Sequence, residues 1–186
     1  MPTWHRLLNE IKERGSTFDV VRRERLKTLA ERTGRNVIIY YFGWLQEPKI
    51  PGTQVSDAGK NGFMTVIHRL DRTKGLDLIL HTPGGETAAT ESLVVYLRVM
   101  FGCDIRAVVP ELAMSAGTMS AGACREIVMG KHSSLGPIDP QFGGIAVHGV
   151  VEEFNRDGRP IPRADRRAAP SRHACGHETG VLRKRG

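Results

Sequence analysis

Strand-like apolar runs alternate with helical patterns through the middle of this chain, and this alternation restricts the fold more than any other feature. The run Val37-Ile38-Ile39-Tyr40-Tyr41 is apolar throughout, as expected of a buried central strand. Strands are predicted over residues 36–44, 76–80, 105–109 and 127–129, with helices over residues 63–71, 87–101 and 116–123. This order predicts an α/β domain with a mainly parallel sheet, joined by right-handed crossovers and flanked by helices.

Helical patterns also fill the region ahead of the first predicted strand. We expect helices over residues 4–14 and 20–32, the second with Asp19 as its N-cap. Both are amphipathic and charged, which favours an arm packed on its own domain, with a membrane surface or a second subunit as alternative contacts. The predicted organisation is an N-terminal helical arm over 1–33, a domain over 34–158 that lacks its C-terminal end, and a tail over 159–186.

The stretch over residues 47–62 contains several Pro and Gly residues and is predicted to be a long loop. Loops of this length often shape substrate sites, and a surface loop is the equal alternative.

The positive charge of the chain is concentrated at one end. The total is +7, and residues 159–186 carry eight basic against two acidic residues, a net +6, which leaves +1 for the first 158 residues. A nearly neutral domain argues against nucleic acid as a partner. The basic tail is expected to be a solvated, disordered or non-native end, with binding of an acidic partner or polyanion as the alternative.

The sequence contains no apolar stretch long enough to cross a bilayer, and its first residues lack the apolar core of a secretory signal. We therefore expect a cytoplasmic protein without an integral membrane segment. The cluster His173-Ala174-Cys175-Gly176-His177 has no second cluster at a familiar spacing, so no metal site is predicted.

Two of the predicted strands end in clusters of small residues. His81-Thr82-Pro83-Gly84-Gly85 follows one strand, and Ala113-Met114-Ser115-Ala116-Gly117 follows the next. Because sites form at the carboxyl ends of parallel strands, the two clusters are expected to meet. Backbone N–H groups beside a hydroxyl give the geometry of acyl transfer, in which donors stabilise the oxyanion that forms on attack. Taken singly, each cluster is also compatible with a tight turn or close helix packing.

Three motifs in a fixed order are more specific than any one of them. The runs are HTPGGETA, AMSAGTMSAGA and VMGKHSSLGPIDPQFGG. Over about residues 34–155 the chain resembles the Clp protease and crotonase superfamily, within it the prokaryotic serine peptidases related to signal peptide peptidase A, and most closely the serine dehydrogenase proteinase family. The resemblance implies a Clp/crotonase-like fold of repeated β-β-α or βαβ units and a serine-type peptidase without a cofactor.

The resemblance also implies site residues. Ser115 matches the nucleophile, with Ser120 in the next helical turn as an alternative. Gly85 and Ala116 would supply the two N–H groups of the oxyanion hole, and glycine suits position 85 because the backbone must approach the scissile carbonyl. The edge that begins at Gly84 would bind an extended peptide as an added strand.

The general base that a serine nucleophile needs is left open by the sequence. Asp139 falls about where Clp-type proteases carry their histidine, as the base or as a residue that orients it, and a carboxylate base would need a pKa raised by burial. Lys131, His132 and His148 are the other candidates. Relatives of signal peptide peptidase A use a lysine farther along the chain, and the tail from Arg159 departs from the family pattern, as if that lysine were missing.

The main hypothesis is a serine peptidase that forms an acyl-enzyme on Ser115, acts on proteins or peptides and assembles as a homo-oligomer, as superfamily members do. The first alternative is a catalytically impaired oligomeric or binding module of the same fold. The second, an acyl-CoA enzyme of crotonase type, is less favoured because such enzymes need two N–H groups but no serine at position 115.

Overall fold

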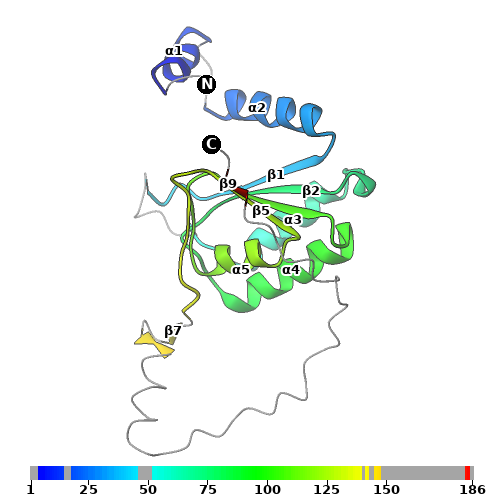
Figure 1. Ribbon diagram of the computed structural model, residues 1–186, viewed down its shortest axis with the longest axis vertical. Helices are drawn as coiled ribbons and strands as arrows, with labels where there is room; N and C mark the ends of the chain where they lie inside the picture. The colour runs from blue at the N-terminus through cyan, green and yellow to red at the C-terminus, as the bar shows by residue number, and fades with distance from the viewer. Residues whose placement is uncertain are drawn as a thin grey trace, which may run out of the picture.

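A parallel sheet forms the centre of the computed structural model (Figure 1). The structure describes residues 4–14, 18–45, 52–139, 141–142, 145–147 and 183–184. The strands of the main sheet are β1 (Asn36–Tyr41), β2 (Leu76–His81), β3 (Ile105–Val109), β5 (Glu126–Met129) and β9 (Arg183–Lys184). They pair in the order β1-β2-β3-β5-β9, and every pair is parallel. The predicted α/β fold with a mainly parallel sheet is confirmed.

A second layer of short strands follows the carboxyl ends of the main strands. After β3 the chain forms β4 (Leu112–Ala113), and after β5 it forms β6 (Ser134–Leu135), which pairs with β4 in parallel. Single parallel bridges join Thr82 to Ala113 and Val55 to Gly85 in the same way. A main strand therefore leads into a short strand before the next helix, which is the β-β-α repeat that the resemblance implied.

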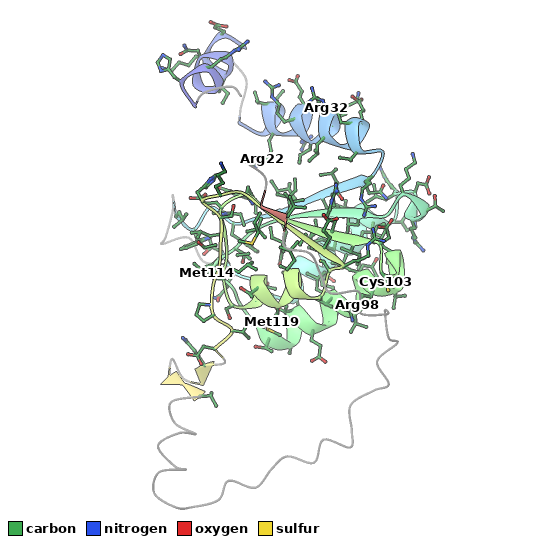
Figure 2. The ribbon with its side chains drawn as sticks, viewed as in Figure 1. Arg22, Arg32, Arg98, Cys103, Met114 and Met119 are labelled. Carbon is green, nitrogen blue, oxygen red and sulfur yellow. The ribbon has the colours of Figure 1, made fainter. Side chains whose placement is uncertain are left out.

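The helices lie on both sides of the main sheet. The helices α3 (Asp57–Ile67), α4 (Thr87–Phe101) and α5 (Ala116–Gly122) lie together on one face, and α1 (Trp4–Arg14) and α2 (Phe18–Thr33) lie beyond the other (Figure 1). Leu76, Leu78 and Leu80 point into the core beneath α4 and α5, each at most 1% exposed. On the opposite face, Arg22 reaches from α2 toward the sheet and places its guanidinium carbon 5.3 Å from the Tyr41 ring centroid (Figure 2).

Helix α3 is where the sequence prediction was wrong. The predicted loop over 47–62 contains the first half of α3, which begins at Asp57 after the N-cap position Ser56 and ends at Ile67 rather than at residue 71. Gly59 and Gly62 indicated a loop but lie inside the helix. A Cβ at Gly59 would lie too close to the Tyr40 hydroxyl, so glycine there permits close packing of helix on strand.

The N-terminal helices were predicted well, apart from one cap. Helix α1 has the predicted bounds, and α2 begins at Phe18, so Asp19 lies within the helix and is not its N-cap. In the predicted tail, Arg183 and Lys184 form β9 beside β5, and the remaining residues of 159–186 lie outside the described residues. The boundaries of arm, domain and tail stay predictions. A small antiparallel pair, β7 (Gln141–Phe142) and β8 (Ile145–Ala146), completes the described strands.

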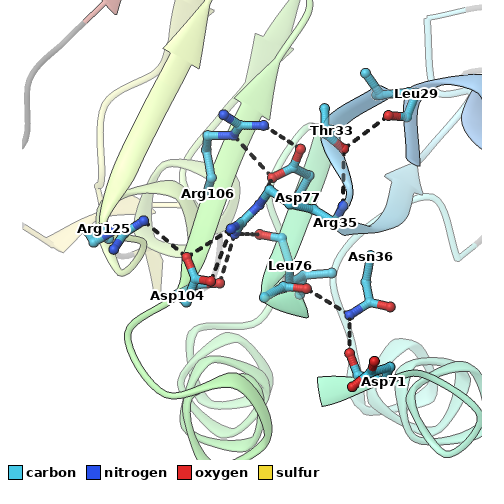
Figure 3. Close-up of polar contacts among 11 residues, drawn as sticks. Leu29, Thr33, Arg35, Asn36, Asp71, Leu76, Asp77, Asp104, Arg106 and Arg125 are labelled. Atoms are coloured by element: carbon cyan, nitrogen blue, oxygen red, sulfur yellow. Dashed lines mark hydrogen bonds and ion pairs between the residues drawn. The ribbon is translucent and has the colours of Figure 1, made fainter. Parts of the chain in front are cut away.

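An ion-pair network ties the amino ends of β1, β2 and β3 together (Figure 3). Asp77 is 1% exposed and accepts hydrogen bonds from Arg35 Nε at 2.6 Å and Arg106 Nη2 at 2.5 Å. Asp104 accepts from Arg35 Nη1 at 2.9 Å and from Arg125 Nη2 at 3.0 Å. Burial lowers the pKa of Arg35, but hydrogen bonds and attraction from both carboxylates together raise it above its ordinary value. The network lies at the opposite end of the strands from the small-residue turns.

Candidate active site

Ser115 occupies a strained turn between a short strand and a helix. Its backbone φ is 46° and ψ is −108°, and it is the only residue other than glycine with positive φ in the described part of the chain. Such a conformation is costly for a residue with a side chain and is found mostly where function requires it. The turn follows β4 and precedes α5, a strand-turn-helix arrangement like the one that exposes the serine hydroxyl at the top of the sheet in α/β-hydrolases.

Gly84 lies directly against Ser115. A Cβ built on Gly84 would lie 2.9 Å from Ser115 Cβ, 3.2 Å from Met114 O and 3.5 Å from Ala116 N. With a φ of 114°, Gly84 also has a conformation that residues with side chains rarely adopt. Two turns that are about 30 residues apart in the sequence are thus in contact, and only glycine fits between them.

Gly85 packs against the backbone of Val55. Its φ is 152°, and a Cβ there would lie 2.3 Å from Val55 O, 2.4 Å from Val55 N and 2.7 Å from Val55 Cα. The missing side chain makes room for the backbone of Val55. The approach of a scissile carbonyl to Gly85, for which the resemblance also favours glycine, stays a prediction.

In the two touching turns, the N–H groups of Gly85 and Ala116 have no backbone acceptor within the described residues, and neither do those of Ser115 and Thr118. Gly84 N–H donates to Thr82 Oγ1 at 3.1 Å, and Gly117 N–H donates to Met114 O at 2.7 Å. Gly85 and Ala116 are the pair that the resemblance assigned to an oxyanion hole. Gly84 C=O accepts from Val55 N–H, so both backbone groups of Gly84 are already hydrogen-bonded. Substrate binding by Gly84 stays a prediction.

Thr82 joins the two turns. Its backbone N–H donates to Leu112 O at 3.2 Å, and its carbonyl accepts from Met114 N–H at 3.0 Å, so it holds the segment that leads to Ser115. Its hydroxyl, fully buried, binds both backbone groups of Gly84. Thr82 was not predicted as a site residue. It stands inside the HTPGG motif, and a buried threonine two residues before a glycine turn was the available signal.

Asp139 follows the strand that runs beside the serine turn. Gly136 N–H donates to Ala113 O at 3.0 Å, and Thr118 Oγ1 lies 2.8 Å from both Ala113 O and Gly136 O. These bonds hold the segment after β6 alongside Met114, and Asp139 lies three residues farther on, half-buried. Within the described residues its carboxylate makes no hydrogen bond, and its role stays a prediction.

The other candidates differ in accessibility. Ser120 is 3% exposed, and its hydroxyl donates to Ala116 O at 2.9 Å in its own helix, which removes it from the surface where a substrate would bind. Lys131 and His132 are exposed at the tip of a turn closed by the bond from Gly130 N–H to Ser133 Oγ. His148 lies outside the described residues.

His81 is a buried polar residue that sequence analysis did not single out. It ends β2, is 2% exposed, and stacks on Tyr41 and Trp44 with ring centroids 4.9 and 6.2 Å away. Its Nδ1 lies 3.8 Å from Glu111 Oε2, and its Nε2 has no hydrogen-bond partner within the described residues. The ring lies on the sheet face opposite α5, because its neighbour Leu80 belongs to the core beneath that helix.

The described residues contain no group of three His, Cys, Asp or Glu side chains placed to hold a metal ion. The cluster over 173–177 lies outside the described residues. In the same described ranges, no helix combines the length and apolar character that a membrane span requires.

The parallel sheet, its second layer of short strands and the serine in a strained turn define a ClpP-like fold. The chain belongs to the ClpP-like SDH-type serine proteinases, whose family model matches residues 17–163. The predicted membership of this family is confirmed.

Two curated relatives come from Methanocaldococcus jannaschii. The chain is 36% identical to the uncharacterized protein MJ1495 over 86 residues, which is 46% of this chain and 29% of that protein. It is 35% identical to the uncharacterized protein MJ0137 over 96 residues, which is 52% of this chain and 33% of that protein. The matched part thus spans about a third of the length of either relative.

Proposed function

We propose that the protein is a serine peptidase that cleaves peptide bonds through an acyl-enzyme on Ser115. The observation that carries this proposal is the contact between Gly84 and Ser115, because it joins the turn that carries Gly85 N–H to the turn that carries Ser115 and Ala116 N–H. Preorganised N–H donors at a developing oxyanion are worth about 10²–10³ in rate each. Membership of a serine proteinase family supports the same reaction.

In this reaction Ser115 Oγ attacks the carbonyl carbon of the scissile amide, and the hydroxyl proton passes to a base. Gly85 and Ala116 donate to the oxygen, which carries the negative charge of the tetrahedral intermediate. The C–N bond then breaks, and the amine leaves with the proton from the base. Water adds to the acyl ester by the same route in reverse, releasing the carboxylic acid and restoring Ser115.

We assign Asp139 to this proton transfer, as the base or as the residue that orients it. The support is its place on the segment that the Gly136–Ala113 hydrogen bond holds beside the serine turn. In Asp139→Asn, loss of the carboxylate should lower the rate of Ser115 acylation by about 10²-fold or more. An unchanged rate in a folded Asp139→Asn variant would remove this residue from the reaction.

The substrate class that fits is a protein or peptide, bound as an extended strand along the free edge of Gly85. We further propose that the active form is a homo-oligomer, with support from the ClpP-like family alone. The cytoplasmic location expected from the sequence stays a prediction.

A fluorophosphonate probe tests the nucleophile. The wild-type chain should be labelled at Ser115, as read by peptide mapping, and Ser115→Ala should not be labelled. Ser120→Ala is the matched control, because its hydroxyl is bound within its own helix, and it should be labelled as fast as wild type. A wild-type chain that is folded and unlabelled would favour the impaired binding module, and stabilisation by CoA esters without labelling would favour the crotonase-type alternative.

A further inference from the structure

The strap formed by residues 52–56 pairs with the glycine turn next to Ser115, through Val55. Val55 N–H donates to Gly84 O at 2.8 Å, and Glu86 N–H donates to Val55 O at 2.9 Å. These two bonds bind the peptide units on either side of Gly85. Val55 is 1% exposed, so water has little access to compete for either bond.

The first of these bonds determines where Gly85 N–H points. Gly84 C=O and Gly85 N–H belong to one planar peptide unit, and the described chain contains no cis peptide bond. In a trans unit the carbonyl and the N–H point in opposite directions. Because Val55 fixes the carbonyl of Gly84, it also directs the N–H of Gly85 to the opposite side, away from the strap. The second bond does the same for Gly85 C=O.

Val55 and Thr82 hold the turn from two directions. The Thr82 hydroxyl binds Gly84 from beneath, and Val55 lies so close that a Cβ on Gly85 would meet its backbone at 2.3–2.7 Å. The peptide unit between Gly84 and Gly85 cannot rotate without breaking the bond from Val55 N–H. The hydrogen bond from Val55 N–H to Gly84 O also polarises the peptide unit that Gly84 shares with Gly85. This makes Gly85 N–H a better donor.

We propose that Val55 is a positioning residue for the oxyanion hole: its backbone holds Gly85 N–H in the direction that the oxyanion of the acyl-transfer intermediate requires. This inference rests on the proposed function and goes beyond it, because it assigns a catalytic consequence to a strap that carries no reactive group. It also means that the strap occupies one edge of the glycine turn, so a substrate strand can add only along the other edge, where the Gly85 groups point.

The test is Val55→Pro, which removes the N–H that binds Gly84 O. The measurement is the second-order rate of Ser115 labelling by a fluorophosphonate, together with the urea midpoint of unfolding. A misplacement of about 1 Å in a reacting group costs about 100-fold in rate, so labelling should slow by about that factor. The matched control is Val55→Ala, which keeps both backbone hydrogen bonds of residue 55.

Val55→Ala separates the side chain from the backbone. It loses buried packing but keeps both hydrogen bonds, so it should unfold at lower urea and still be labelled within a few-fold of wild type. A Val55→Pro variant that is folded and labelled at the wild-type rate would overturn the positioning role and leave the nucleophile intact. A wild-type chain that is not labelled at Ser115 would overturn both.

If Val55→Pro does not fold, amide hydrogen exchange in the wild-type chain tests the positioning role of Val55 instead. An oxygen of the phosphonylated Ser115 would accept from Gly85 N–H and so stabilise the turn. By linkage, exchange at Val55 and Glu86 should slow by about tenfold after labelling. Unchanged exchange at both amides in fully labelled protein would contradict the proposal.

Discussion

Gly84 and Ser115 are packed so closely that a methyl group added at Gly84 would push their two turns apart. A Cβ on Gly84 would lie 2.9 Å from Ser115 Cβ, a distance that forces one of them to move. The contact joins the turn after β2, which carries Gly85, to the turn after β4, which carries Ser115 and Ala116. The geometry of the site therefore depends on the absence of one side chain.

Gly84→Ala should damage both the site and the fold. The methyl group meets Ser115 Cβ and Met114 O, and φ of 114° is unfavourable for alanine, at a cost of about 1–3 kcal/mol. We expect Ser115 labelling to slow by about 100-fold. The free energy of unfolding should fall by about 1–3 kcal/mol. Probe kinetics measure the labelling rate, and urea denaturation measures the free energy of unfolding.

Gly62→Ala is the control for that substitution. Gly62 lies within α3, and a Cβ there would meet nothing within 4 Å. Alanine should leave labelling unchanged and stabilise the helix by about 0.5–1 kcal/mol. Equal labelling rates in the two alanine variants would show that close packing at Gly84 does not matter for the site.

Thr82 should act through its hydroxyl. Thr82→Val keeps the shape of the side chain but leaves Gly84 N–H without its acceptor, at a cost of about 1–3 kcal/mol for an unsatisfied buried group. Thr82→Ser keeps the acceptor and loses only a methyl group that packs beneath Gly117. We expect labelling to slow at least tenfold in the valine variant and to recover in the serine variant. Similar rates in both would indicate that the methyl group, not the hydroxyl, matters.

The sequence predicted most of the sheet because its signal is local. The strand from Leu76 alternates core and outer positions, and helix α4 has the predicted bounds from Thr87 to Phe101. Helix α3 was misjudged because Gly59 and Gly62 are poor helix formers, and the role of Gly59 depends on its contact with Tyr40, which is distant in the sequence. Strands β4 and β6 contain two residues each and have no periodicity to detect.

The candidate site also contains residues that the sequence could indicate and residues that it could not. Ser115, Gly85 and Ala116 could be named because they stand in short motifs at strand ends. Val55 could not, because it contributes only backbone groups, and any residue except proline provides those. The sequence also does not show whether Gly84 or Gly85 lies against Ser115, because this depends on backbone angles that no residue type specifies. In the structure Gly84 packs against Ser115, and Gly85 packs against Val55.

The ion-pair network at the far end of the sheet should matter for stability. In Asp77→Asn, the buried carboxylate that binds Arg35 and Arg106 is lost, so Arg106 loses its carboxylate partner and Arg35 keeps only Asp104. Breaking a buried pair costs about 3–5 kcal/mol, which a urea midpoint would show. Asp104→Asn is the comparison, since that side chain is 41% exposed and its loss should cost about 1 kcal/mol or less. A smaller loss at Asp77 than at Asp104 would contradict this ranking.

Cys124 should be unreactive while the protein is folded. Its thiol donates to Ser120 O at 3.3 Å and packs against the core. Burial raises its pKa to about 12, partly opposed by Arg98. Because the thiolate is the nucleophile, iodoacetamide at pH 8 should leave Cys124 unmodified in the folded chain and alkylate it in urea. Peptide mapping reads this residue alone, and equal rates in both states would show that the thiol is accessible.

The same raised pKa predicts a loss of stability in alkali. The unfolded thiol has an ordinary pKa of about 8.5, so below that pH both states keep the proton and the stability is fully present. As pH rises toward 12 the unfolded chain loses the proton first, and the free energy of unfolding falls. Other groups titrate in this range, so the measured quantity is the difference between wild type and Cys124→Ala in urea midpoints from pH 8 to 11. That difference should shrink or reverse with pH, because only the wild type gains from ionising the unfolded thiol, and a constant difference would contradict a buried neutral thiol.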